Sequence, residues 1–266
     1  MSAATLPSPA SGVARLVQRL ATNRFLPAPP PALMLCGDGD YRAIGAEFLG
    51  HFITSGGLAP HERVLDIGCG AGRMAVPLTQ YLDDEGSYDG LDVAAAGIAW
   101  CDETLTPTYP AFRFHHLDLA HPLYNPSGSL PTDAARLPFP DASFDFICLV
   151  SVLTHLEATE VAHYAQEVAR LLAPGGRCFA TALLMNPPAR AALQAGGGAL
   201  AFDPAAPGPV WHADTSAPLG AVAFDEDMLL DLFLRAGLSR RPGAQYGAWS
   251  GRDAPVFQGI CVFERT

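Results

Sequence analysis

The chain has 266 residues, of which 49% are apolar and 16% charged, enough to bury the core of one large α/β domain or two small ones. Acidic residues outnumber basic ones 27 to 16, and the formal net charge of -11 disfavours a nucleic-acid partner. No polybasic segment is present to bind a membrane surface.

Residues 1–33 are rich in proline and contain one short helical pattern over 13–21, so we interpret them as an N-terminal arm. Residues 34–266 form the main domain in this interpretation. A helical pattern begins after Asp40 and ends at two glycines, 56 and 57. Asp40 suits the helix N-cap, and Asp38 and Tyr41 beside it are candidates for closing over a bound ligand.

Short strand patterns then alternate with helical stretches or a long loop, which predicts an α/β fold with a doubly wound parallel sheet. The expected strands are 63–67, 88–92, 112–117, 144–150 and 177–184, and the clearest later helices are 159–173 and 225–236. The last run, 256–264, follows 238–241 through only a loop and should pair antiparallel. The Gly-, Ala- and Pro-rich segment 194–222 is expected to be a lid or substrate loop.

A glycine-rich turn follows the first strand, in Asp66-Ile67-Gly68-Cys69-Gly70-Ala71-Gly72. Doubly wound sheets bind nucleotide-like ligands at such turns. The dinucleotide fingerprint would need glycine at position 73, where this chain has Arg73, so NAD is disfavoured. Asp66, directed at the turn, would repel a pyrophosphate and suits a ligand with an ammonium group.

Two further acids end the second and third strands. Asp92 is placed to accept both hydroxyls of a ribose, and Asp118 could accept from an exocyclic adenine amine. Three acids at consecutive strand ends are a more specific signal than a glycine pattern alone.

With these residues, the sequence resembles the class I S-adenosylmethionine-dependent methyltransferases, and within them the small-molecule type 11 branch. Two more segments carry the resemblance: Leu137-Pro138-Phe139-Pro140-Asp141 before the fourth strand, and Ala169-Arg170-Leu171-Leu172 with Pro174-Gly175-Gly176 before the fifth. The resemblance implies a Rossmann-like seven-stranded sheet with an antiparallel last strand, S-adenosylmethionine as cofactor and a small-molecule substrate.

The resemblance also implies the cofactor contacts: Asp66, Gly68 and Gly70 at the methionine part, Asp92 at the ribose, and Asp118 with Leu119 at the adenine. Cys69, Val93 and Ser151 are expected to complete this set. One departure is an insertion at 120–136, which makes Asp133 a rival for the adenine contact. Asp118 is preferred because it directly ends a strand.

His155 follows the fourth strand and is the candidate general base that would accept a proton from a substrate hydroxyl. The alternative is a structural histidine at the start of the next helix. Trp211 and His212 in the expected lid, and Tyr246 and Trp249 near the C-terminus, are the candidate substrate contacts. For these four residues, packing within loops and turns is the competing interpretation.

The six cysteines are widely separated and lack metal-ligand spacing, so we expect no metal site and a reducing, cytoplasmic compartment. No signal peptide or membrane-spanning run is recognised. The sequence thus favours O-methylation of a secondary metabolite or sugar. N- or C-methylation, a nicotinamide-dependent oxidoreductase and a non-catalytic cofactor-binding protein are the alternatives, and the oligomeric state is open.

Overall fold

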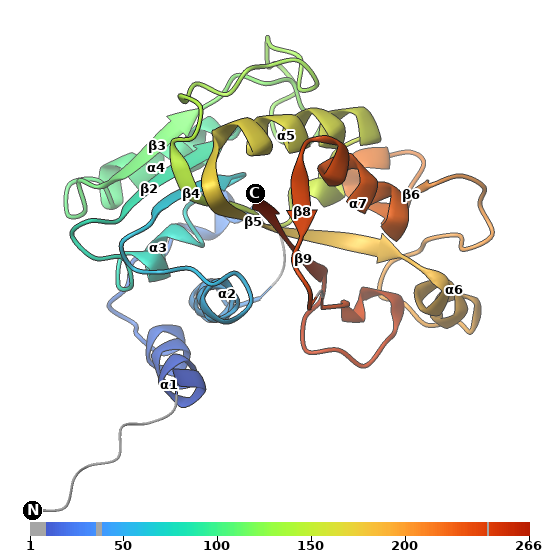
Figure 1. Cartoon of the computed structure of the whole chain (residues 1–266), viewed down its shortest axis with the longest axis horizontal. Helices are drawn as coiled ribbons and strands as arrows, with labels where there is room; N and C mark the ends of the chain where they lie inside the picture. Colours follow the sequence, from blue (N-terminus) through green and yellow to red (C-terminus); the bar gives the residue numbers. More distant parts are fainter. Residues whose placement is uncertain (1–8, 36–38, 244) are drawn as a thin grey trace, which may run out of the picture.

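The structure, a computed structural model, describes residues 9–35, 39–243 and 245–266, which form a mixed sheet with helices on both faces (Figure 1). The helices are α1 (Pro9–Ala21), α2 (Tyr41–Thr54), α3 (Ala75–Leu78), α4 (Ala95–Thr104), α5 (Ala158–Leu171), α6 (Pro187–Gln194) and α7 (Glu226–Arg235). The strands are β1 (Arg63–Ile67), β2 (Ser87–Asp92), β3 (Phe112–His116), β4 (Phe144–Leu149), β5 (Leu172–Met185), β6 (Val210–His212), β7 (Val222–Asp225), β8 (Leu238–Arg240) and β9 (Gly259–Arg265). Four short 3-10 turns complete the described elements: η1 (Pro31–Leu33), η2 (Leu153–His155), η3 (Pro218–Gly220) and η4 (Ala248–Ser250).

The strand order confirms the expected doubly wound sheet. Five parallel strands run β3-β2-β1-β4-β5, and β9 pairs antiparallel with β5 and with β8. These are the seven expected strands, with β9 as the antiparallel last one. The described residues add two that were not expected, because β7 pairs parallel with the far end of β5 and β6 pairs antiparallel with β7.

Side-chain alternation along β1 separates two hydrophobic cores. Leu65 packs in one core with Val168 of α5 and with residues of α7. Its neighbour Val64 faces the opposite core, which contains Phe52 of α2 and residues of α1, α3 and α4. Because successive strand residues point to opposite faces, the buried run of β1 requires cover on both sides, and the helices supply it.

The N-terminal arm is part of the core rather than a free appendage. Its helix α1 begins earlier than expected, at Pro9, and Leu20 and Leu26 are buried against α2 and its neighbours. Asp40 caps α2 as expected, since its carboxylate accepts a hydrogen bond from the Ala43 amide at 2.8 Å. Asp38, the other acid named there, lies outside the described residues.

The segment 194–222 contains secondary structure that its composition did not indicate. It includes β6 and η3, and the side chains of Phe202 and Trp211 are buried with Leu193 of α6 in a third hydrophobic cluster. Its role as a lid stays a prediction. β7 pairs with the far end of β5 and β6 pairs with β7, and Figure 1 shows α6 just beyond that end of β5.

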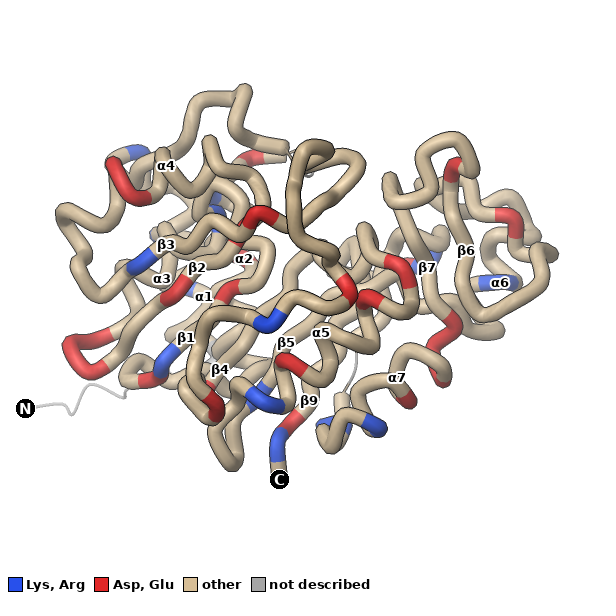
Figure 2. The backbone as a smooth tube through the Cα atoms, turned by 90° about the horizontal axis from the view of Figure 1, so that it is seen from above, with Lys and Arg blue, Asp and Glu red and all other residues tan. Residues whose placement is uncertain are grey.

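Charged positions are spread over the whole molecule (Figure 2). In the described part of the chain, eight of the sixteen basic residues form ion pairs with acids, such as Arg63 with Asp145 and Arg177 with Glu62. Acidic positions are the more numerous, as the sequence requires.

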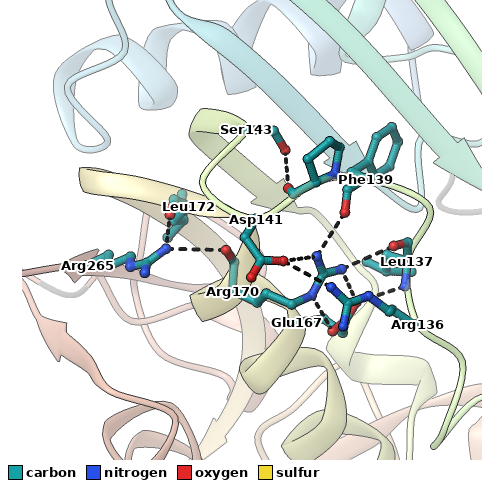
Figure 3. A network of polar contacts seen from close by, with 10 residues as sticks. Arg136, Leu137, Phe139, Asp141, Ser143, Glu167, Arg170, Leu172 and Arg265 are labelled. Atoms are coloured by element: carbon teal, nitrogen blue, oxygen red, sulfur yellow. Dashed lines mark hydrogen bonds and ion pairs between the residues drawn. The ribbon is translucent and has the colours of Figure 1, made fainter.

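Arg170 of α5 joins the two sequence segments that carry the family resemblance outside the glycine turn (Figure 3). Its guanidinium donates to the carbonyls of Leu137 and Phe139, to the Asp141 carboxylate at 2.8 Å and to both oxygens of Glu167. Glu167 in turn accepts from the Leu137 amide at 2.8 Å. The two segments therefore have a structural role, which is to hold the loop before β4 against α5.

Replacing Arg170 with alanine should lower the free energy of unfolding by about 3 kcal/mol, because it leaves the buried Glu167 carboxylate without its ionic partner. Arg170→Lys keeps the charge but loses the planar fork, so its loss should be smaller. Urea unfolding of both variants measures the difference. Equal losses would show that the geometry of the fork contributes nothing.

Candidate active site

The turn after β1 adopts a backbone conformation that favours glycine. Gly68 and Gly70 have φ angles of +81° and +54°. A Cβ at Gly68 would come within 2.4 Å of the Val152 side chain, whereas no atom lies within 4 Å of the equivalent position at Gly70. The turn therefore packs closely against the segment after β4 at Gly68 and leaves open space at Gly70.

Asp92, at the end of β2, fixes the glycine turn to the neighbouring strand. Its carboxylate accepts from the amides of Gly70 and Ala94, both at 2.7 Å. Burial raises the pKa of Asp92, and these amides partly oppose the rise by stabilising the charged form. Since each carboxylate oxygen can accept a second hydrogen bond, Asp92 retains acceptor capacity for a ligand.

Asp66 is a buried acid on β1 whose hydrogen-bond partners are neutral. It accepts from the Tyr88 hydroxyl at 2.6 Å, and burial raises its pKa to about 6. The ordinary value near 4 applies in the unfolded chain, so the folded protein holds the proton more tightly between about pH 4 and 6. Above pH 6 the ionised carboxylate destabilises the ligand-free fold.

We therefore expect Asp66→Asn to raise the free energy of unfolding of the ligand-free protein by about 1–3 kcal/mol above pH 7. The gain should shrink as the pH falls from 6 towards 4, because the parent becomes protonated and neutral there as well. Melting temperatures across this pH range measure the effect. A variant less stable than the parent at pH 7.5 would contradict the stated cost of the charge.

These residues line a cavity of about 290 Å³ at the carboxyl ends of the parallel strands. The walls come from six parts of the chain: the arm at 32–35, Tyr41 of α2, the glycine turn at 66–74, the end of β2 and start of α4 at 91–97, the segment 117–132, and residues 150–156 with Tyr164 of α5. The sheet edge thus brings together segments that are far apart in the sequence.

Most of the expected cofactor contacts lie on this cavity, and one does not. The lining includes Asp66, Gly68, Cys69, Gly70, Asp92, Val93, Leu119 and Ser151. The structure does not bring Asp118 there, although its neighbours Leu117 and Leu119 both line the cavity. Its exposed carboxylate instead accepts from Ser129 and Asn125, which tie the following loop.

The rival acid, Asp133, is exposed and does not line the cavity either, although its neighbour Thr132 does. Neither acid lines the cavity, and the residue that contacts the adenine stays a prediction.

Ser151 lies directly after β4 with a positive φ of 59°, which is rare outside glycine. Its amide donates to the Thr181 hydroxyl at 2.8 Å, and the Gln258 amide donates to its hydroxyl at 2.9 Å. Hydrogen bonds to β5 and to the residue before β9 thus fix this strained residue at the cavity wall.

His155 lies on the cavity wall with both ring nitrogens engaged. Nδ1 lies 2.8 Å from the carbonyl oxygen of Leu219 in η3, and Nε2 lies 3.3 Å from the Tyr124 hydroxyl. A carbonyl can only accept, so Nδ1 carries the proton and Nε2 of the neutral ring is the acceptor. Burial lowers the pKa of His155, which keeps the ring neutral near pH 7.

The four expected substrate contacts lie away from this cavity. Trp211 is buried, with Arg190 stacked 4.4 Å from its ring centroid, and Trp249 is buried against Phe202. His212 pairs with Glu157 at 3.0 Å, and the Tyr246 hydroxyl donates to Glu226 at 2.9 Å. The structure therefore gives these residues packing and ion-pair contacts, and their binding of substrate stays a prediction.

Several lining residues were not expected at the site from the sequence. They are Leu33 at the end of the arm, Met34 and Leu35 just after it, His121, Tyr124 and Thr132 of the insertion, Arg73, and Tyr164. Tyr41, which was considered for closing over a ligand, does line the cavity, and its hydroxyl donates to the Ala71 carbonyl at 2.8 Å. The insertion itself was recognised, but its contribution to the site was not.

No cluster of His, Cys, Asp and Glu suited to a metal ion occurs among the residues that the structure describes. In that same part of the chain, no helix combines the length and apolar character needed to span a membrane.

Residues 65–180 match the family described as "Methyltransferase domain". Among curated proteins, the chain is 30% identical over 126 residues to 27-O-demethylrifamycin SV methyltransferase of Amycolatopsis mediterranei, covering 47% of this chain and 40% of that protein. It is 27% identical over 139 residues to arsenite methyltransferase of Aquipseudomonas alcaligenes, covering 51% and 37%.

A third relative is a tRNA N(3)-cytidine methyltransferase of Danio rerio, 27% identical over 126 residues, covering 45% of this chain and 31% of that protein. The chain thus spans less than half of the length of each of these relatives.

Solved structures share the fold. A SAM-dependent methyltransferase from Methanosarcina mazei aligns over 80% of this chain and 96% of its own, with a TM-score of 0.54 and 19% identity. The 1,6-didemethyltoxoflavin-N1-methyltransferase of Burkholderia thailandensis aligns over 100% and 93%, with a TM-score of 0.53 and 16% identity.

Proposed function

We propose, on the premise that this chain carries a class I S-adenosylmethionine-dependent methyltransferase domain, that it transfers a methyl group to a hydroxyl of a small molecule. The observation that carries the proposal is the cavity, which combines the buried Asp66 and the half-buried Asp92 at the glycine turn with a histidine acceptor and a largely apolar wall.

The residues at the turn fit S-adenosylmethionine. Asp66 is a buried acid whose neighbours in the structure are neutral donors, so a ligand ammonium would supply the missing positive charge. Asp92 keeps acceptor capacity for a ribose diol, and Gly70 presents backbone without a side chain in the way. When bound, the sulfonium supplies an electrophilic methyl group.

The protein's own contribution is to position the acceptor and to receive its proton. Bringing a nucleophile into line with the methyl group supplies most of the acceleration in such a displacement. We propose that Nε2 of His155 is the final proton acceptor, since its lone pair is fixed by the tautomer and the lowered pKa keeps it neutral.

A small-molecule acceptor is favoured over a nucleic acid by the charge distribution. The net charge is -11, and basic positions are spread among more numerous acidic ones (Figure 2). A tRNA would need a contiguous basic surface to neutralise its phosphates. The similarity to a tRNA-modifying enzyme is therefore assigned to the shared cofactor half of the fold.

Two measurements test the proposal. Calorimetry should show that S-adenosylhomocysteine binds, and the ligand should raise the melting temperature by mass action. Transfer of labelled methyl from S-adenosylmethionine is then screened over matched panels of small hydroxyl, amine, thiol and carbon acceptors, with tRNA as a separate arm.

Labelling confined to hydroxyl compounds is the expected result. Labelling of amines, of carbon or of tRNA would replace the proposed acceptor. Binding without transfer to any panel would indicate a non-catalytic cofactor-binding protein, and binding of a reduced nicotinamide in place of the sulfur ligand would overturn the family-level assignment.

A further inference from the structure

The insertion at 120–136 does more than lengthen the chain, because it places a phenol on the cavity wall beside His155. Tyr124 and His155 both line the cavity, and the Tyr124 hydroxyl lies 3.3 Å from Nε2 of His155. The two rings meet edge to face, with centroids 5.4 Å apart. The lone pair on Nε2 is thus directed at the phenolic proton.

Two separate segments, η3 and the insertion, hold this pair in place. The Leu219 carbonyl of η3 fixes the proton on Nδ1 of His155. His121 of the insertion lies 2.9 Å from the backbone carbonyl of His155, and its other ring nitrogen accepts from the amides of Leu123 and Tyr124. His121 therefore connects the turn that carries Tyr124 to the turn that carries His155.

The loop around Tyr124 is itself closed by side chains. Asn125 donates to the Leu119 carbonyl at 3.0 Å, and the Thr132 hydroxyl donates to the Ala120 carbonyl at 2.8 Å. Asp118 binds Ser129 across the same loop. A loop closed at so many points presents its one phenol in a defined position, which is what recognition of a hydroxyl requires.

We propose that Tyr124 is the catalytic residue that touches the acceptor hydroxyl, and that His155 is a positioning residue that receives the proton through Tyr124. The inference deepens the proposed function and rests on it. The substrate class it names is an uncharged molecule whose hydroxyl can donate to a phenol oxygen, attached to an apolar body that fills the wall formed by Leu33 and Met34.

Methyl transfer moves one methyl group and two protons. The acceptor oxygen uses a lone pair to form the new O–CH3 bond, while the electron pair of the broken S–CH3 bond stays on sulfur. The acceptor's proton passes to the Tyr124 oxygen as the phenolic proton passes to Nε2 of His155. Tyr124 ends neutral, His155 ends as a cation, and release of that proton to water restores the pair.

In the resting protein, the surroundings of His155 favour the neutral ring over the cation. Burial and the neighbouring His121 lower its pKa. The other titratable groups on the cavity wall are Asp66, Asp92, Tyr41, Tyr164, Cys69 and Arg73. Glu157, two residues after His155, forms an ion pair with His212. A neutral ring accepting from Tyr124 is the state these contacts hold.

The first test needs no acceptor and uses the ligand-free full chain. Nitrogen-15 spectra of labelled histidine should show His155 with its proton on Nδ1. Tyr124→Phe should shift the Nε2 resonance and raise the pKa of His155, because a competing donor to that nitrogen is removed. Tyr109→Phe, at a half-buried tyrosine that contacts Gln80 and does not line the cavity, is the matched control and should change neither quantity.

An Nε2 signal that is the same in Tyr124→Phe and in the parent would overturn the hydrogen-bonded pair itself, whatever the reaction.

The second test uses the best hydroxyl compound from the panel screen. Tyr124→Phe should lower kcat by about 10²-fold and leave the affinity for S-adenosylhomocysteine unchanged.

The acidic limb of the pH profile of kcat should also move in Tyr124→Phe, because the pKa of His155 changes. Loss of a purely structural tyrosine would leave that limb in place. Near-parental kcat and an unmoved limb would overturn the relay while the methyltransferase assignment stands. Failure of the parent to bind S-adenosylhomocysteine would instead overturn the proposed function, and the nitrogen-15 result would still decide whether the pair exists.

Discussion

Replacing His155 with alanine should lower turnover of a hydroxyl acceptor by about 10²–10⁴-fold while leaving the affinity for S-adenosylhomocysteine nearly unchanged. The ring lies beside the insertion and η3, whereas most of the expected cofactor contacts are on the glycine turn and the ends of β1 and β2. Single-turnover rates and calorimetry on the same preparations separate the two effects.

The alanine variant also loses the contact to the Leu219 carbonyl, so its effect mixes chemistry with local packing. His155→Asn provides the control, because the asparagine amide can replace the Nδ1 proton as donor but offers no basic nitrogen at the position of Nε2. We expect a near-parental melting temperature with the same loss of turnover. Parental turnover in the asparagine variant would show that His155 has only a structural role.

Residues that end strands could be placed from the sequence because strand geometry fixes them. Asp66 and Asp92 belong to buried parallel strands, and the carboxyl ends of such strands meet at one edge, so both were expected at one site and both line the cavity. The same argument failed for Asp118, because β3 ends at His116 and the next residues enter a loop. Beyond the last ladder pair, the side chain's direction is set by the loop's own contacts with Asn125 and Ser129.

Loop residues could not be placed, because their neighbours are set by tertiary contacts that leave no periodic trace. Trp211 illustrates this: a glycine- and proline-rich context suggested a lid, but pairing of β6 with β7 buries the indole. Tyr124 is the converse case. The insertion was visible in the sequence, yet only the contacts of His121 and Asn125 decide that its phenol faces His155.

The position of the N-terminal arm could not be predicted from the sequence either. Its helical pattern was visible, but a boundary after residue 33 divides a segment whose residues 32–35 line the cavity. Packing of Leu20 and Leu26 against the main core explains the continuity. A proline-rich composition predicts how stiff a connection is, and it does not indicate which surface the connection lies against.

Asp92→Ala should weaken binding of S-adenosylhomocysteine by about 10²–10⁴-fold, because two hydrogen bonds from a diol to a charged acceptor are lost. The variant also frees the amides of Gly70 and Ala94, which could loosen the turn. Asp102→Ala, at an exposed acid on α4, is the matched control and should bind as the parent does. Calorimetry of the three proteins gives the comparison.

A change on the ligand separates recognition of the ribose from loosening of the turn. Adenosine and 2′,3′-dideoxyadenosine, used as competitors of S-adenosylhomocysteine, differ only in the hydroxyls that Asp92 is expected to bind. The parent should bind adenosine more tightly than the dideoxy compound, and Asp92→Ala should bind the two equally. One change removes the carboxylate and the other removes the ribose hydroxyls, so the coupling energy between them measures the contact of Asp92 with the ribose. Equal preference for adenosine in both proteins would assign Asp92 to holding the glycine turn, through the Gly70 amide, and would leave the ribose to another residue.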